Sequence, residues 1–183
     1  MSDFLLINPY IADVAAYDFW NKPLGLLYIS SILKKNNLSV DFIDLTDRFN
    51  YGQSEPRTQR GFTGKYNAEL FENRRIGKGR FNLRKYGLSI IRFKELLSEM
   101  ESPKSVLITT GMTYWSQGVF ETAKVVKDVL GGVEICVGGN AAILNSEVYP
   151  GKVNIERVFS DTSMETFYRY VEEITDKALD FKT

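Results

Sequence analysis

The stretch FLLINP, residues 4–9, decides the fold of this chain, together with PLGLLYISSILKKNN (23–37) and VDFIDL (40–45), which follow it. Residues 4–7 are all apolar, which is typical of a strand covered on both faces in a parallel sheet. Pro23 suits a first helical turn, and apolar residues around much of the following helix predict a largely buried helix ending near Asn36. The short connections predict a right-handed βαβ unit and a parallel sheet.

The C-terminal half continues this alternation. Ser89 is a predicted N-cap for a helix reaching Met100, and residues 119–130 form an amphipathic helix closed by Gly131. Strands are predicted at 105–109, 134–137 and 155–159, and TSME (162–165) predicts a capping box that opens a last helix. We therefore predict an α/β fold: a three-layer, doubly wound, five-stranded parallel sheet in the flavodoxin-like order 2-1-3-4-5. Residues 1–175 form this domain, and 176–183 begin a linker or tail.

A long basic insertion, residues 48–88, follows the second predicted strand. It has five glycines between 47 and 86 and little helical or strand periodicity, and a connection of this length usually signals function or mobility. Residues 48–95 carry 12 Lys/Arg and 4 Asp/Glu, a net charge of +8, so the rest of the neutral chain carries −8. The segment is either a solvated basic loop or a surface for an acidic partner, a phosphate-bearing ligand or nucleic acid. Nucleic acid is the weakest of these because no recognition motif accompanies the charge.

The composition excludes several chemistries. The chain has no histidine, which rules out a Ser-His-Asp or Cys-His arrangement and a histidine-ligated zinc site. Its one cysteine, Cys136, lies in an apolar run and is expected to be a buried structural thiol, so a disulfide scaffold is excluded. The apolar runs are too short for a bilayer and the N-terminus lacks the features of a signal peptide. We expect a cytoplasmic protein without membrane contact.

A ligand site is expected beyond the carboxyl ends of the strands, at the switch point between the first and third strands. The loops that leave these ends contain Asn8 to Tyr10, Thr110 to Tyr114, Gly138 to Asn140 and Ser160 to Thr162. No G-x-G-x-x-G follows the first strand, which argues against a dinucleotide. The same loop lacks the Ser/Thr/Gly residues that hold a flavin phosphate, and the third strand ends in threonines instead of a phospho-accepting aspartate.

What remains is a pocket of small and apolar groups. Gly138 and Gly139 would let backbone approach a flat ligand closely, but a lone Gly-Gly pair is weak evidence for this and is more simply explained as a turn. Tyr114 and Trp115 follow a buried strand, where they could stack on a planar cofactor or simply cover helix ends.

Several motifs together resemble the cobalamin-binding domains at the N-terminus of radical S-adenosylmethionine proteins. They are LLINP (5–9), KPLGLLY (22–28), VDFID (40–44), TGMTYW (110–115) and VGGNA (137–141), in the expected order and spacing. The resemblance covers nearly the whole chain. FSDTSME (159–165) lies where that group has a Gly-Glu-Gly-Glu-like turn and departs from it, and residues 61–84 look like an insertion.

The resemblance implies a corrinoid ligand whose nucleotide tail enters a slot between the first and third strands. The cofactor-binding residues that it implies are Asn8, Pro9, Tyr10, Pro23, Leu24, Gly25, Thr110, Gly111, Met112, Thr113, Tyr114, Gly138, Gly139 and Asn140. The Asp-x-His-x-x-Gly motif is absent, so no histidine ligates cobalt from below. The Cys-x-x-x-Cys-x-x-Cys motif is also absent, so this chain holds no iron–sulfur cluster or S-adenosylmethionine, and we assign it neither a catalytic residue nor a metal ligand. Its partner would be a radical catalytic core, in the same longer protein or in trans.

Two further interpretations stay open. The domain could keep the fold without a cofactor and act as an interaction or structural domain. It could also be an enzyme of its own that binds a nucleotide or anion near the basic insertion, through Arg74, Arg75, Lys78, Arg80, Arg84 and Lys85.

Overall fold

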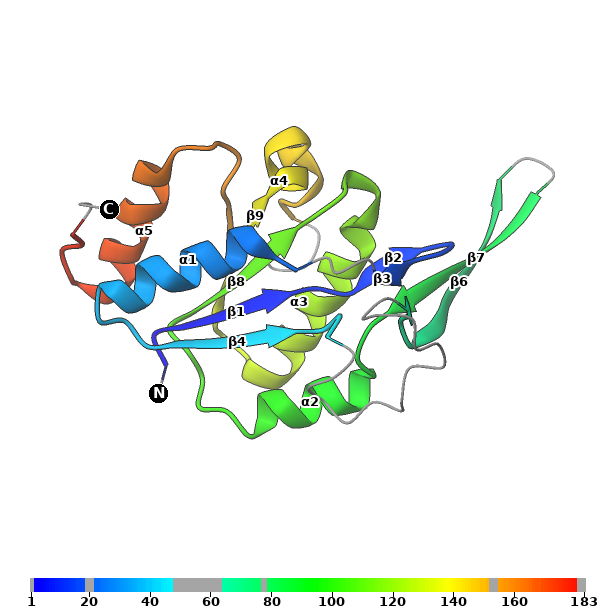
Figure 1. Cartoon of the computed structure of the whole chain (residues 1–183), viewed down its shortest axis with the longest axis horizontal. Helices are drawn as coiled ribbons and strands as arrows, with labels where there is room; N and C mark the ends of the chain where they lie inside the picture. Colours follow the sequence, from blue (N-terminus) through cyan, green and yellow to red (C-terminus); the bar gives the residue numbers. More distant parts are fainter. Residues whose placement is uncertain (1, 19–21, 48–63, 77–78, 152–154, 181–183) are drawn as a thin grey trace.

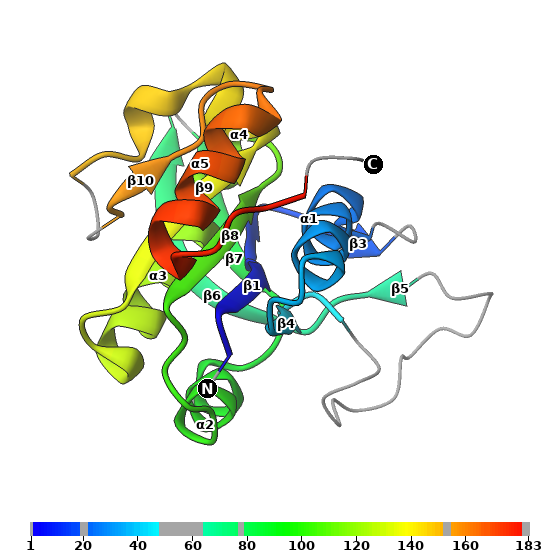
Figure 2. The same cartoon turned by 90° about the vertical axis from the view of Figure 1, so that its left-hand side faces the viewer.

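The structure, a computed structural model, describes residues 2–18, 22–47, 64–76, 79–151 and 155–180. Five parallel strands form its central sheet, in the spatial order β10-β9-β8-β1-β4 (Figures 1 and 2). They are β1 (Phe4–Asn8), β4 (Val40–Asp44), β8 (Ser105–Thr110), β9 (Glu134–Gly139) and β10 (Arg157–Val158). The predicted α/β class with a parallel five-stranded sheet is confirmed. When only the five strands of this sheet are numbered along the chain, their spatial order is 2-1-3-4-5. When all described strands are numbered, the order differs from the predicted one, because strands of the other sheets intervene along the chain.

Helices cover both faces of the sheet (Figures 1 and 2). The side chains of Phe4 and Leu6 pack with α1 (Leu24–Lys35) and α5 (Met164–Thr175). The alternate residues, Leu5 and Ile7, pack with α2 (Ile90–Ser98) and α3 (Ser116–Leu130). Strand periodicity therefore divides one continuous apolar run between two cores, and the architecture has three layers.

The helix α1 corrects one expectation. It ends at Asn36 as predicted, but it is not largely buried, since Leu24 is 73% exposed and Tyr28 54% exposed. Only one side of the helix, with Leu26 and Leu33, reaches the sheet. Apolar residues on the other side, such as Leu24 and Tyr28, are exposed. Apolar residues around much of a helix therefore did not mean that the helix is largely buried.

The N-termini of α2 and α5 can be compared with the caps predicted from local sequence. Ser89 caps α2 by accepting a hydrogen bond from the Arg92 backbone N–H at 3.3 Å, as predicted. The predicted capping box of α5 is wrong. The N-cap is Ser163 and makes no side-chain cap bond, because the Asp161 carboxylate accepts from the Ser163 backbone N–H at 2.8 Å and shapes the turn instead.

The basic insertion contains strands that the sequence did not reveal. The strands β6 (Ala68–Ile76) and β7 (Gly79–Tyr86) form an antiparallel hairpin, and β2 (Ile11–Asp13) pairs with β7 to complete a three-stranded sheet. A second small sheet joins β3 (Tyr17–Asp18) to β5 (Gly64–Lys65). An irregularity between Leu70 and Glu72 shifts the register of the hairpin, which interrupts the period-two pattern by which a strand is recognised. We call residues 68–86 the basic arm; it extends away from the body of the domain in Figure 1.

Short elements complete the chain. The helix α4 (Asn140–Leu144) and the 3₁₀ turns η1 (Thr113–Trp115) and η2 (Ser146–Val148) were not predicted, and β10 is shorter than the expected strand 155–159. After α5 the chain turns back, and Leu179 is buried with its backbone N–H donating to Glu172 at 3.1 Å. The assignment of 176–183 to a linker stays a prediction.

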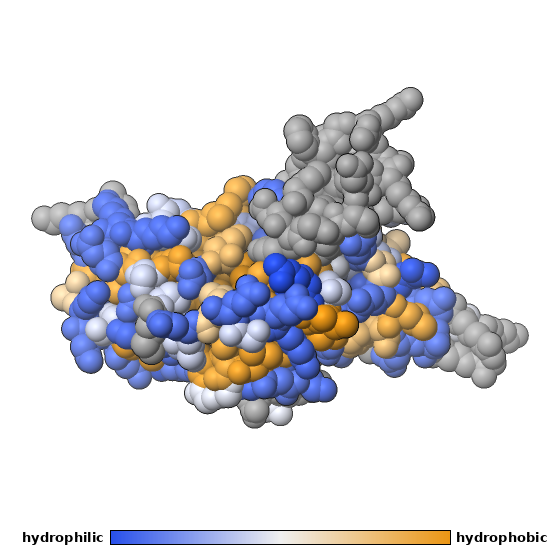
Figure 3. All heavy atoms as spheres, turned by 90° about the horizontal axis from the view of Figure 1, so that it is seen from below, coloured by the Kyte–Doolittle hydropathy of each residue, from blue (hydrophilic) through white to orange (hydrophobic). Residues whose placement is uncertain are grey.

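The surface on the side of α2 is a patchwork of hydrophilic and hydrophobic residues (Figure 3). Across the described residues, no helix combines the length and the apolar character needed to cross a membrane.

Candidate functional site

A broad pocket of about 760 Å³ lies at the carboxyl ends of β1 and β8, between the first turn of α1 and α4. We call it the outer basin. Twelve of the fourteen residues implied by the resemblance line it: Asn8, Pro9, Tyr10, Pro23, Leu24, Gly25, Thr110, Gly111, Met112, Thr113, Gly139 and Asn140. These residues come from four separate segments of the chain, and the parallel sheet brings them together because its carboxyl ends meet at one edge.

The other two residues lie elsewhere. Tyr114 is 63% exposed and packs edge-on against Trp115, with ring centroids 5.8 Å apart, so it does not line the basin. Trp115 does line the basin, and its indole N–H donates to the Asp13 carboxylate at 2.8 Å. Of the two aromatic residues, Trp115 is therefore the one that shapes the site. Gly138 lines a second, neighbouring pocket.

A network of hydrogen bonds holds the floor of the basin at the ends of β1 and β4. The Asn8 amide donates to the Asp44 carboxylate at 2.7 Å and to the Thr46 hydroxyl at 3.0 Å. The Thr46 hydroxyl donates in turn to the same Asp44 oxygen at 2.7 Å. Asp44 is buried, and its carboxylate joins the two exit loops, so the loop geometry is preorganised by charge-assisted bonds.

Thr110 and Gly139 line the basin, and each also has a structural role in the sheet. The buried Thr110 hydroxyl donates to the Gly138 carbonyl and accepts from the Ala142 N–H, both at 2.9 Å, and so ties β8 to β9 and α4. Gly139 has φ of 106°, and a Cβ there would lie 2.7 Å from the Thr110 carbonyl oxygen. Glycine is therefore required at 139 by the protein's own backbone, whereas a Cβ at Gly138 would meet Phe159 at an ordinary 3.4 Å.

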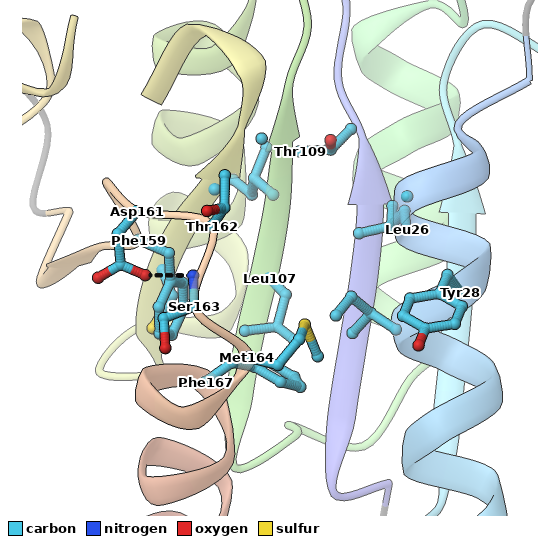
Figure 4. Close-up of a pocket in the computed structure, with 16 residues that line it drawn as sticks. Leu26, Tyr28, Leu107, Thr109, Phe159, Asp161, Thr162, Ser163, Met164 and Phe167 are labelled. Atoms are coloured by element: carbon cyan, nitrogen blue, oxygen red, sulfur yellow. Dashed lines mark hydrogen bonds between the residues drawn. The ribbon is translucent and has the colours of Figure 1, made fainter. Parts of the chain in front are cut away.

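The second pocket is a narrower space of about 270 Å³ over β8 and β9, flanked by α1 and α5 (Figure 4). We call it the inner slot. It shares Gly25, Thr109, Gly139 and Thr162 with the outer basin, so the two pockets adjoin. Its buried wall is apolar, with Leu26, Leu107 and Phe167 at its depth, and Asp161 to Ser163 lie exposed at its rim.

Sequence reasoning placed the slot differently. It expected a slot between the first and third strands, lined by Thr110, Met112 and Thr113 and closed by Gly138, Gly139 and Asn140. Thr110, Met112, Thr113 and Asn140 line only the outer basin, whereas Gly138 and Gly139 line the inner slot. Among the residues it missed are four on the flanking helices: Leu26 and Ile29 of α1, and Met164 and Phe167 of α5. Their spacing indicates an ordinary helix–sheet core, and only the packing of α1 and α5 leaves a gap between them.

The inner slot ends near a buried polar cluster. The Cys136 thiol donates to the Tyr170 hydroxyl at 3.0 Å, and that hydroxyl donates to the Ser105 hydroxyl at 2.5 Å. Burial raises the pKa of the Cys136 thiol to about 12 and also raises the pKa of Tyr170. Cys136 is therefore the free, buried structural thiol that the sequence predicted.

The anion-binding candidates of the basic arm divide into three groups. Lys85 is 5% exposed, pairs with Glu69 at 3.1 Å and lies 4.9 Å from the centre of the Tyr10 ring, so it supports the base of the arm. Arg84 is exposed. The side chains of Arg74, Arg75 and Arg80, and the whole of Lys78, lie outside what the structure describes.

The carboxyl edge of the sheet thus carries two adjoining pockets, and hydrogen bonds hold the loops around the larger one. A scan against protein-family models gave no match, and neither did a search of the curated proteins.

Proposed function

We propose that this chain is a cobalamin-binding module of a radical S-adenosylmethionine enzyme, which holds the cofactor with its nucleotide tail inserted. The observation that carries the proposal is the pairing of a broad basin with a narrow apolar slot that adjoins it. A corrinoid has the matching parts, a wide flat macrocycle and a flat aromatic base at the end of a flexible tail. Neither a dinucleotide nor a flavin phosphate finds its usual loop after β1.

The sizes of the two pockets fit this ligand. A volume of about 760 Å³ lies within the range of roughly 300–1,000 Å³ that is usual for cofactor sites. A dry cavity of about 150 Å³ is enough for a benzene ring, so the 270 Å³ of the inner slot suit a bicyclic aromatic base. Burial of such a base against Leu107 and Phe167 would supply most of the tail's binding free energy through the hydrophobic effect.

The chain's own residues would bind and orient the cofactor. Asn8 and Trp115 are fixed by their partners Asp44 and Asp13, so they present rigid walls to the macrocycle. The sequence has no histidine, so this chain would supply no imidazole ligand to a bound cobalt. When bound, cobalamin supplies a metal centre that can carry a methyl group or an electron, and we assign the reaction itself to the separate catalytic core.

The basic arm is the surface that we propose to contact this core. Between residues 73 and 84 the sequence has five Lys or Arg and no Asp or Glu. Leu70 and Phe81 of the arm are 59% and 42% exposed, although both are large apolar residues. Positive charge next to exposed apolar side chains is typical of a protein-docking surface with an acidic counterpart.

The test is titration of the purified chain with hydroxocobalamin. We expect a shifted visible spectrum and corrin that stays with the protein through a desalting column. Gly138→Val, which adds bulk against Phe159 beside the inner slot, should weaken retention at least tenfold, whereas Gly132→Ala, where nothing lies within 4 Å of the added Cβ, should not. An unshifted spectrum with complete loss of corrin on desalting would overturn the proposal.

A second candidate is a cofactor-less interaction domain. The observation that favours it is the apolar rim of the basin, where Leu24 and Leu144 are 73% and 76% exposed. A chain that binds a radical catalytic core in a pull-down but retains no corrin would support this alternative.

A further inference from the structure

The inner slot lacks a free polar side chain at its depth. Its buried side chains on this face of the sheet are Leu26, Leu107, Cys136 and Phe167. Cys136 carries the one side-chain heteroatom among them, and its thiol already donates to the Tyr170 hydroxyl at 3.0 Å. The hydroxyl and carboxylate side chains that line the slot belong to Tyr28, Thr109, Asp161, Thr162 and Ser163, which are exposed or half-buried.

Figure 4 shows how these residues lie. Leu107, Met164 and Phe167 lie close together at the start of α5, and Asp161 and Thr162 lie on the loop before that helix. Thr109 lines both pockets and so marks the junction between slot and basin. A ring that passes this junction meets hydrocarbon and ring faces, and its own polar groups lose water without gaining a partner.

We infer that the inner slot selects corrinoids whose tail ends in an apolar aromatic base, of the benzimidazole or phenol class, over those that end in a purine. This inference rests on the proposed function and deepens it. Adenine carries an exocyclic amine and extra ring nitrogens that would be buried against this wall unpaired. Each unpaired polar group weakens binding by about tenfold or more.

The depth of the slot gives a second reason for selectivity. Rejection of a polar analogue is strongest where its groups are removed from water, and at the base of the slot they would lie against Leu26, Leu107 and Phe167, which are themselves buried. A purine held at the mouth instead, near Asp161, would leave the apolar wall empty and lose the hydrophobic contribution of the tail.

The experiment compares three corrinoids on the intact chain: cobalamin, the corresponding adenine-based cobamide, and cobinamide, which lacks the nucleotide tail. Dissociation constants come from visible-spectrum titrations. We expect cobalamin to bind at least tenfold more tightly than the adenine-based cobamide, and cobinamide to bind more weakly than cobalamin. A phenol-type cobamide should bind within about threefold of cobalamin.

The outcomes separate the two proposals. Equal affinity for cobalamin and the adenine-based cobamide overturns the selectivity while the proposed function stands. Equal affinity for cobalamin and cobinamide also overturns it, since the tail would not enter the slot. If none of the corrinoids binds, the proposed function fails and the selectivity with it.

A matched pair of variants gives an internal check. Met164→Gln places an amide of nearly the same size at the first residue of α5, where the half-buried side chain lines the slot. It should reduce the preference for cobalamin over the adenine-based cobamide at least threefold. Ile91→Gln, an exposed position on α2 away from both pockets, should leave the preference unchanged. If circular dichroism shows that Met164→Gln is folded and its preference for cobalamin over the adenine-based cobamide is unchanged, the assignment of the slot is contradicted.

Discussion

Gly118 of α3 lies directly against the backbone of Tyr10, and a Cβ at position 118 would stand 1.9 Å from the Tyr10 carbonyl oxygen. The helix therefore rests on the segment that joins β1 to β2 and forms part of the outer basin. Close packing of a helix on backbone requires glycine at the contact. The shape of the basin thus depends on a residue that lines neither pocket.

We expect Gly118→Ala to destabilise the protein. Alanine improves helix propensity by about 1 kcal/mol, but the clash with Tyr10 forces a backbone shift, and overpacking of this kind costs about 1–3 kcal/mol or more. The clash should win, and the urea midpoint should fall. Gly132→Ala, where the added Cβ meets nothing within 4 Å, is the control. A midpoint for Gly118→Ala equal to that of the control would contradict the observed packing.

The hydroxyl of Thr110 should matter more than its size. Thr110→Val removes the hydroxyl that donates to the Gly138 carbonyl and accepts from the Ala142 N–H. Such a loss costs about 1–3 kcal/mol per buried group. Chemical denaturation should show this loss, and cobalamin affinity should fall as the loop loosens. Thr110→Ser keeps the hydroxyl, so a serine variant as impaired as the valine variant would refute the hydrogen-bonding role.

The buried thiol predicts a loss of stability in alkali. The pKa of Cys136 is raised by burial from 9.0 to about 12 in the folded protein. Above pH 9 the unfolded chain therefore releases this proton more readily than the folded one, and stability that is fully present below pH 9 declines as the pH rises toward 12. Urea midpoints measured from pH 7 to 10 should decline more steeply in the wild type than in Cys136→Ser. Parallel declines would argue against the shift.

Buried tyrosines set the upper limit of the pH range that is useful in that experiment. Burial raises the pKa of Tyr10, Tyr149 and Tyr170 above the ordinary value of 10.0. Their contribution to stability is likewise lost as the pH rises above 10, in wild type and variant alike. The difference due to Cys136 should therefore be read between pH 9 and 10.

A charge reversal on the basic arm can distinguish a role in partner docking from a role in anion binding. Arg84→Glu reverses an exposed charge on β7. If the arm serves a protein partner, cobalamin affinity at low salt should stay within about twofold of the wild type, because Arg84 lines neither pocket. Loss of corrinoid or nucleotide binding in this variant would support an anion site on the arm instead. Lys85 is unsuitable for this test because it is buried and paired with Glu69.

The sequence by itself determined the alternation of strands and helices and the edge of the sheet at which the outer basin lies. Runs such as residues 4–7 have one physical explanation, a strand buried on both faces, and Ser89 and Gly131 punctuate helices through local hydrogen bonds and dihedral angles. These are short-range effects, and each can be recognised from its own segment of the sequence. Twelve of the fourteen residues implied by the resemblance line the one basin at this edge.

Only the tertiary structure decided which residues form the inner slot and why each glycine is needed. Leu26 and Phe167 look alike in sequence to any helix core residue, and the gap between them depends on how far apart α1 and α5 pack on the sheet. Gly139 and Gly118 are required by backbone atoms of Thr110 and Tyr10, which are distant in the chain. The strands of the basic arm were hidden for a related reason, since a register shift between Leu70 and Glu72 breaks the local alternation and pairing across the hairpin replaces it. Long-range packing and pairing leave no local pattern, so they become visible only when the chain is folded.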